Sequence, residues 1–303
     1  MRREFSTTIE KIAREKPELV FLTGDLGFMA LENVRDAIGE RFINAGVSEQ
    51  NMVSLAAAMA SEGLLPVCYS IAPFMVYRPA EQIRLDVCLH NLNVKIVGNG
   101  GGYGYGIMGA THHALEDIAV LSSFQHMRCF IPFSNEDVAG TVAAMFAYTG
   151  PSYFRLGFGT LPEGLVLPPY QPVRKLYDGE ELTIIGMGPV LLNLFKVPGM
   201  MDHTLSADVF AISEVPLPGL TLELIDSIRK TSRVLVIEEH VKRGGLGEHL
   251  AAHILENNLS CTFKQLYAEG YPDGLYGSQG YHQSISGLDA VNIAQVINQM
   301  IHG

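Results

Sequence analysis

Residues 41–69, RFINAGVSEQNMVSLAAAMASEGLLPVCY, decide the fold. Short apolar runs open and close this stretch, at Arg41–Ala45 and Leu65–Tyr69, and an Ala-rich segment with helical character, Gln50–Glu62, lies between them. A strand, a helix and a second strand in this order predict a βαβ unit, in which the two strands run parallel.

The same alternation continues on both sides of this stretch. Further predicted strand and helix pairs are Leu19–Thr23 with Glu32–Ile38, Leu65–Tyr69 with Ala80–His90, Val94–Gly98 with Glu116–Phe124, and Arg128–Pro132 with Asn135–Tyr148. Repeated pairs of this kind are typical of a parallel sheet that helices cover on both faces. We therefore predict an α/β domain over residues 1–165.

A second α/β unit is predicted after a proline-rich stretch. Leu161–Pro172 holds four prolines and shows no helical period, so we expect a linker that extends over residues 166–180. The elements predicted beyond it are strands at Leu182–Gly186, Ala207–Ser213 and Arg233–Ile237, and helices at Leu220–Lys230, Glu248–Glu256 and Ala290–Ile301. The expected fold class is α/β, with two doubly wound domains of which the second, residues 181–303, is the smaller.

Composition excludes several classes of protein. The 303 residues carry 21 Lys and Arg against 32 Asp and Glu, a net charge of −11, which disfavours a nucleic-acid binder. Residues 1–20 are charged and amphipathic, unlike a signal peptide, and no run is long enough for a membrane span. The four cysteines lie far apart and predict reduced thiols. We expect a cytoplasmic protein that binds neither nucleic acid nor membrane.

Two motifs suggest other functions. Gly104–Gly109 fits the pattern G-x-G-x-x-G, but Asn99–Tyr103 separate it from the preceding predicted strand, which favours a flexible glycine loop over a dinucleotide site. His249 and His253 have zinc-ligand spacing, but Leu250 stands where a metalloprotease has its glutamate, and no third ligand is evident nearby. Packing or surface histidines are the simpler interpretation.

A second group of residues points to acid and base chemistry. Glu49 opens an apolar helix, where a carboxyl either caps the helix or, desolvated by its neighbours, has a raised pKa and donates protons. Phe74 and Tyr77 follow the next predicted strand, at the sheet edge where α/β folds bind ligands. Beyond the glycine loop, the adjacent His112 and His113 are suited to proton transfer with a substrate oxygen.

Several sequence runs resemble the transketolase family. FINAGVSEQNMVSLAAAMASEGLLPV at 42–67, YSIAPFMVYRPAEQIR at 69–84 and GATHHALEDIAVL at 109–121 resemble its pyrimidine-binding domain, in this order. VLVIEEHVKRGGLGEHLA at 234–251 and GLDAVNIAQVI at 287–297 resemble its C-terminal domain. The resemblance implies a thiamine diphosphate enzyme that transfers a two-carbon ketol or acyl unit from a ketose or 2-oxo donor to an aldehyde.

The resemblance also implies roles for single residues. Glu49 matches the glutamate that hydrogen-bonds a ring nitrogen of the cofactor's aminopyrimidine, and His112 matches the histidine that meets the substrate, so both are expected to be catalytic. Phe74 matches the aromatic residue that stacks on the pyrimidine. The further cofactor contacts implied are Ile71 and Tyr77, which line the same pocket, and Asp25 in TGDLG.

Substrate contacts are expected from Arg78, Met108, His113 and Phe158. Met108 and Phe158 stand where relatives carry an aspartate for a donor hydroxyl and an arginine for a phosphate, and Gly100 and Gly101 replace basic residues. Each lost charge-assisted bond costs roughly 1.5–3 kcal/mol. We therefore expect a less hydroxylated or unphosphorylated substrate, unless a partner chain supplies the cations.

One part of the family's machinery is missing. Gly24-Asp25-Leu26-Gly27 lacks the Gly-Asp-Gly pattern that holds the diphosphate and its divalent cation, such as Mg²⁺. The resemblance thus implies the C-terminal subunit of a split transketolase, with no metal ligands of its own, which works only with an N-terminal partner in an α2β2 heterotetramer. A dehydrogenase E1 beta subunit is the alternative among enzymes, although THHALED and EEHVKRGGLG favour transketolase. A catalytically silent scaffold or nucleotide-binding module is the alternative outside them.

Overall fold

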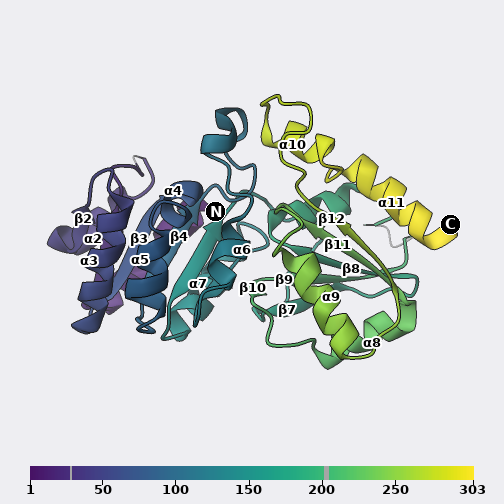
Figure 1. Cartoon of the computed structure of the whole chain (residues 1–303), viewed down its shortest axis with the longest axis horizontal. Helices are drawn as coiled ribbons and strands as arrows, with labels where there is room; N and C mark the ends of the chain where they lie inside the picture. Colours follow the sequence, from purple (N-terminus) through teal and green to yellow (C-terminus); the bar gives the residue numbers. More distant parts are fainter. Residues whose placement is uncertain (28, 201–204) are drawn as a thin grey trace.

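The computed structural model describes residues 1–27, 29–200 and 205–303 and contains two sheets flanked by helices (Figure 1). The strands of the first sheet are β1 (Leu19–Thr23), β2 (Phe42–Asn44), β3 (Leu65–Ile71), β4 (Lys95–Asn99), β5 (Arg128–Phe130), β6 (Ser152–Leu156) and β10 (Glu214–Val215). They are ordered β10-β5-β6-β4-β3-β1-β2, and β10 alone among these described strands runs antiparallel. The mostly parallel first domain is therefore confirmed.

Helices and short turns connect these strands. They are α1 (Arg2–Glu15), α2 (Glu32–Ile38), η1 (Gly39–Arg41), α3 (Glu49–Ser61), α4 (Ala72–Val76), α5 (Ala80–Gln82), η2 (Ile83–Cys88), η3 (Gly106–Thr111), α6 (Asp117–Ser122) and α7 (Val138–Ala147). In α1, Phe5, Ile9 and Ala13 recur every four residues and are buried, so a single apolar stripe packs this helix onto the sheet.

The second sheet has five strands. They are β7 (Val173–Tyr177), β8 (Leu182–Met187), β9 (Ala207–Ile212), β11 (Arg233–Glu238) and β12 (Thr262–Leu266), in the order β12-β11-β8-β9-β7. Its helical segments are η4 (Pro189–Lys196), α8 (Leu222–Thr231), α9 (Leu246–Glu256), α10 (Gln279–Ile285) and α11 (Ala290–His302). All pairs are parallel except β7 with β9, which confirms the second α/β unit. None of the helices in the described ranges is long and apolar enough to span a membrane.

The two units are joined by apolar and polar contacts. One cluster of buried side chains runs from Val20 and Met52 in the first unit to Phe210 and Val236 in the second. The strand β10 follows β9 in the chain yet pairs with β5 at the edge of the first sheet. A buried ion pair between Arg174 of β7 and Asp137 adds two hydrogen bonds of 2.7 and 2.6 Å. The loops at this junction are therefore held from both sides.

Two predicted segments differ from the structure. The single helix expected over Ala80–His90 is a short α5 followed by the π-helical η2, and the unexpected α4 precedes them, because Pro79 cannot donate a helical hydrogen bond. The stretch 166–180, expected as a linker, includes β7, which needs a hydrogen-bonding partner on one side only because it lies at the sheet edge. The prolines end at Pro172, immediately before this strand.

Candidate active site

The carboxyl of Glu49 lies buried at the carboxyl-terminal edge of the first sheet. Glu49 is the first residue of α3 and is 3% exposed, which confirms the burial predicted for it. Its Oε1 accepts a hydrogen bond of 3.1 Å from the Ser70 hydroxyl, and its Oε2 accepts one of 3.0 Å from Arg78 Nη1. Within the described residues, neither oxygen bonds an amide of α3, so the carboxyl is turned away from its own helix and does not cap it.

Arg78 bridges two of the predicted cofactor residues. Besides its ion pair with Glu49, its guanidinium carbon lies 3.8 Å from the centre of the Phe74 ring. A flat cation that donates N–H bonds to a carboxylate and stacks on an aromatic face makes the contacts that a flat, N–H-bearing heterocycle requires. The residues present therefore fit the aminopyrimidine of thiamine diphosphate. The structure places Arg78 against these two residues, 43% of its side chain being exposed.

The other predicted cofactor residues lie on the same edge. Ile71 ends β3, and Tyr77 follows α4 directly. The Tyr77 hydroxyl donates to Glu116 Oε2 over 2.9 Å and accepts from the Glu116 amide over 3.1 Å, which ties α4 to the start of α6.

Asp25 follows β1 on this edge with a positive φ of 46°. Its carboxyl accepts a hydrogen bond of 2.9 Å from the side-chain amide of Asn44, and its backbone N–H donates to the same side chain over 3.1 Å. The structure does not bring Asp25 into hydrogen-bond contact with Glu49.

His112 comes from a loop on the other side of Phe74. Its ring centre lies 5.1 Å from that of Phe74, edge to face, and 5.7 Å from that of Tyr105. Its Nδ1 bonds the Thr111 hydroxyl over 2.8 Å. Glu49, Phe74 and His112, which are far apart in the sequence, thus surround one place at the sheet edge.

His113 is turned into the second unit instead. It is 2% exposed, and both ring nitrogens are bonded within the chain, Nε2 to the Gly106 carbonyl at 2.8 Å and Nδ1 to the Tyr271 hydroxyl at 2.7 Å. The two adjacent histidines therefore have different surroundings, and the structure does not bring His113 to Phe74.

Two arginines that no sequence motif singles out line a neighbouring cavity. This cavity of about 490 Å³ lies beside Tyr105 and Phe158 and includes Arg2 and Arg3 at the start of α1. Phe158 is largely exposed, as is Met108 on the nearby loop. The expected lack of cations around Phe158 is therefore wrong. No pattern in the linear sequence indicates that the start of α1 meets the ends of β4 and β6.

The alternative motifs are not built as the corresponding sites. Gly104–Gly109 lies five residues or more beyond Asn99, the end of β4, and forms the short turn η3 in place of the long helix of a dinucleotide fold. His253 of α9 pairs with Glu256 over 3.2 Å. Over the described ranges, no three His, Cys, Asp or Glu side chains are grouped so that they could hold a metal ion.

Comparisons with known proteins agree with this architecture. Residues 1–162 match the family model for the transketolase pyrimidine binding domain, and residues 172–274 match that for the transketolase C-terminal domain. The chain is 31% identical to a subunit of the apulose-4-phosphate transketolase of Phocaeicola vulgatus, over 84% of each chain. It is 30% identical to a putative transketolase C-terminal section of Methanocaldococcus jannaschii, over 98% of this chain and 95% of that one.

A solved structure gives the same result. The structure described as a split gene transketolase, inactive beta4 tetramer, superposes with a TM-score of 0.82 at 25% identity, over 99% of this chain and 97% of the other. The matched domains, in the same order and with the same extent, leave the diphosphate-binding part of the family outside this chain. The chain belongs to the thiamine diphosphate-dependent transketolase family and is like the subunit of a split transketolase that carries these two domains.

Proposed function

We propose that this chain is the C-terminal subunit of a split transketolase that transfers a two-carbon ketol or acyl unit from a ketose or 2-oxo donor to an aldehyde. The observation that carries the proposal is the meeting of a buried carboxyl, an aromatic face and a half-buried imidazole at one sheet edge, at Glu49, Phe74 and His112. The fit of the Arg78 guanidinium between the first two supports a flat, N–H-bearing ligand there.

Each residue has a definite task in this proposal. Glu49 binds a ring nitrogen of the aminopyrimidine, Phe74 stacks on that ring, and Ile71 and Tyr77 line the pocket, with Asp25 near the subunit boundary. When bound, thiamine diphosphate supplies the nucleophilic carbon that cleaves the bond beside a ketone. His112, whose Nδ1 is held by Thr111, keeps Nε2 to exchange a proton with a substrate oxygen.

The diphosphate and its cation are assigned to a partner subunit. Mg²⁺ and similar cations require several oxygen ligands, and the described residues present no group of acidic side chains that could hold one. The split organisation named for two of the relatives supports an N-terminal subunit that carries these ligands. An α2β2 heterotetramer is the simplest symmetric assembly in which both halves of the site meet.

The substrate is proposed to carry an anionic group. Arg2 and Arg3 line the cavity that Tyr105 and Phe158 share, and Tyr105 contacts His112. Guanidinium groups bind phosphate through charge-assisted hydrogen bonds. We therefore expect phosphorylated ketoses to be better donors than their unphosphorylated counterparts, as a comparison of kcat/KM for the two would show. Equal values would contradict this part of the proposal.

The proposed function is tested with both subunits. We expect a co-expressed polypeptide carrying Gly-Asp-Gly to purify together with this chain, and the pair alone to retain thiamine diphosphate and convert a ketose and an aldehyde. Full activity of the isolated chain would contradict the split site. Acyl transfer to lipoamide by the pair, in place of ketol transfer, would indicate the E1 beta alternative. Normal turnover after Glu49→Ala would leave only a structural subunit.

A further inference from the structure

The loop that carries His112 is anchored on the second unit. This loop, residues 100–114 and called the histidine loop below, is closed at its base by the paired backbones of Gly102 and Ala114, with bonds of 2.9 and 3.0 Å. The Tyr103 hydroxyl donates to the Gly270 carbonyl over 3.0 Å and accepts from the Gly270 amide over 2.9 Å. Figure 1 shows the loop rising between the two sheets beside α10.

Close backbone packing holds the tip of the loop. Gly109 has φ of 71°, and a Cβ there would lie 2.7 Å from the Tyr276 ring. Gly106 has φ of 49°, and a Cβ there would lie 3.2 Å from the Gln279 amide nitrogen. Only glycine combines this backbone conformation with so little space. The tip of the histidine loop therefore lies directly on residues 276–279 of the second unit.

The hydrogen bonds of His113 fix one tautomer. A carbonyl oxygen can only accept, so Nε2, which bonds the Gly106 carbonyl, carries the proton. In a neutral imidazole, Nδ1 is then an acceptor, and the Tyr271 hydroxyl donates to it. Burial lowers the pKa of His113 to about 4, so the ring stays neutral near pH 7. His113 thus serves as one donor and one acceptor between the loop tip and the second unit.

We propose that His113 is a positioning residue, which, through the Tyr271 hydroxyl, fixes the histidine loop on the second unit and so holds His112 beside Phe74. The backbone of the two histidines supports this coupling, because the amides of His112 and His113 both donate to the Gly109 carbonyl, over 2.9 and 3.1 Å. A movement of His113 therefore moves the turn that presents His112. The proposal deepens the proposed function, on which its kinetic consequence rests.

A proton-carrying role for His113 makes a different prediction. A glutamine side chain is neutral at all relevant pH values and offers both an N–H donor for the Gly106 carbonyl and an oxygen acceptor for Tyr271. A leucine offers neither. Positioning by His113 is thus rescued by His113→Gln and lost in His113→Leu, whereas proton transfer by His113 is lost in both variants. Tyr271→Phe removes only the hydroxyl that donates to His113.

The first measurement needs no activity. Hydrogen–deuterium exchange of the full-length chain, followed by mass spectrometry, reports opening of the histidine loop. We expect exchange of residues 104–112 to be about tenfold faster in His113→Leu and Tyr271→Phe than in wild type, and close to wild type in His113→Gln. Tyr267→Phe, which removes a tyrosine hydroxyl elsewhere on the second unit, is the matched control and should leave this exchange unchanged.

The second measurement uses the assembled two-subunit enzyme. We expect His113→Leu and Tyr271→Phe to lower kcat by about tenfold or more, since small displacements of a reacting group are costly, with the Kd for thiamine diphosphate and the melting temperature close to wild type. His113→Gln should keep kcat within about threefold of wild type and leave the pH profile of kcat unchanged.

Three results would overturn the proposal. Wild-type loop exchange in both His113→Leu and Tyr271→Phe would show that this contact does not hold the loop. Full kcat in both variants would show that the loop does not position His112. Loss of one limb of the pH profile in His113→Gln would assign proton transfer to His113. A wild-type pair that binds no thiamine diphosphate would contradict the proposed function instead, and the exchange measurement would still judge the anchoring contact.

Discussion

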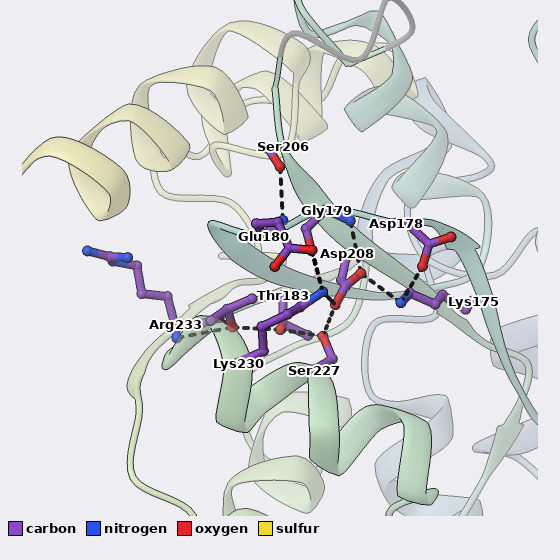
Figure 2. A network of polar contacts seen from close by, with 11 residues as sticks. Lys175, Asp178, Gly179, Glu180, Thr183, Ser206, Asp208, Ser227, Lys230 and Arg233 are labelled. Carbon is purple, nitrogen blue, oxygen red and sulfur yellow. Dashed lines mark hydrogen bonds and ion pairs between the residues drawn. The ribbon is translucent and has the colours of Figure 1, made fainter.

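Two buried carboxylates, one in each unit, show how burial serves different ends. Asp208 of β9 is fully buried, and each of its oxygens has two donors: Oδ1 bonds Lys175 Nζ at 2.8 Å and the Gly179 amide at 3.0 Å, and Oδ2 bonds the Ser227 hydroxyl at 2.6 Å and Lys230 Nζ at 2.9 Å (Figure 2). Glu49 has two partners, Ser70 and Arg78, one on each oxygen.

The difference lies in what remains available to a ligand. An ionised carboxylate has about four acceptor positions. Asp208 uses all of them on groups from β7, α8 and the turn before β8, so it fastens the edge of the second sheet. Glu49 uses half of them, and one of its partners is an arginine whose side chain is 43% exposed. A saturated carboxylate stabilises the fold, whereas an unsaturated one at a sheet edge can take part in binding and chemistry.

The largest effect expected from this comparison is on turnover. Glu49→Gln keeps the size of the side chain but removes the acid, and loss of a positioned acid or base typically lowers kcat by about 10²- to 10⁴-fold. We expect a fall of this size in the two-subunit enzyme, measured as ketol transfer at saturating substrate. Glu81→Gln, on the exposed start of α5, is the matched control and should have wild-type kcat. Near-normal turnover of Glu49→Gln would break the distinction between the two carboxylates.

The second prediction concerns stability. Asp208→Asn leaves Lys175 and Lys230 without their buried counter-charge, which should lower the free energy of unfolding by about 3 kcal/mol. Urea denaturation followed by circular dichroism measures this loss. For Glu49→Gln we expect a much smaller loss, because Arg78 can turn into solvent. Equal losses for the two variants would show that saturation of the carboxylate is not the deciding feature.

The third prediction concerns acid. Burial alone pushes the pKa of Asp208 up, but hydrogen bonds from Lys175, Ser227, the Gly179 amide and Lys230 outweigh it and lower the pKa to about 2. A folded-state pKa below the ordinary 3.8 contributes stability above about pH 4, which is lost as the pH falls towards 2. The difference in unfolding free energy between wild type and Asp208→Asn should therefore shrink between pH 5 and pH 3. A constant difference would contradict the assignment.

The smallest effect is expected at Arg78. Its guanidinium lies on the Phe74 face and on the Glu49 carboxyl, the contacts proposed for the aminopyrimidine, so it competes with the cofactor. Arg78→Met should tighten thiamine diphosphate binding to the two-subunit enzyme by about three- to tenfold, because the pocket is no longer partly occupied. Titration calorimetry measures this change. Weaker binding would show that Arg78 itself contacts the cofactor.

The sequence predicts the layout of the fold better than the contacts of the site. Alternating apolar strands and helices predict both sheets, and the position of Glu49 after a strand and before an Ala-rich helix predicts its burial. Side-chain pairs that close over long distances in the chain are not encoded in a local pattern. His113 meets Tyr271 158 residues away, and β10 crosses from the second unit to the first sheet.

Local breaks in periodicity explain the other differences. Pro79 interrupts what reads as one helix, and the edge strand β7 follows a proline-rich stretch that masks it. Arg2 and Arg3 look like ordinary exposed residues of an amphipathic helix, because only the packing of α1 brings its start to the ends of β4 and β6. Patterns of two to four residues thus predict elements, and tertiary packing decides which side chains share a cavity.

The most direct test of the account is the affinity of the two-subunit complex for thiamine diphosphate, measured by titration calorimetry with Mg²⁺ present. We predict that wild type and Asp208→Asn bind with the same Kd at a temperature where both are folded, and that Glu49→Gln binds at least about tenfold more weakly, since one charge-assisted hydrogen bond is lost. Equal Kd values for wild type and Glu49→Gln would contradict the claim that this carboxyl holds the cofactor.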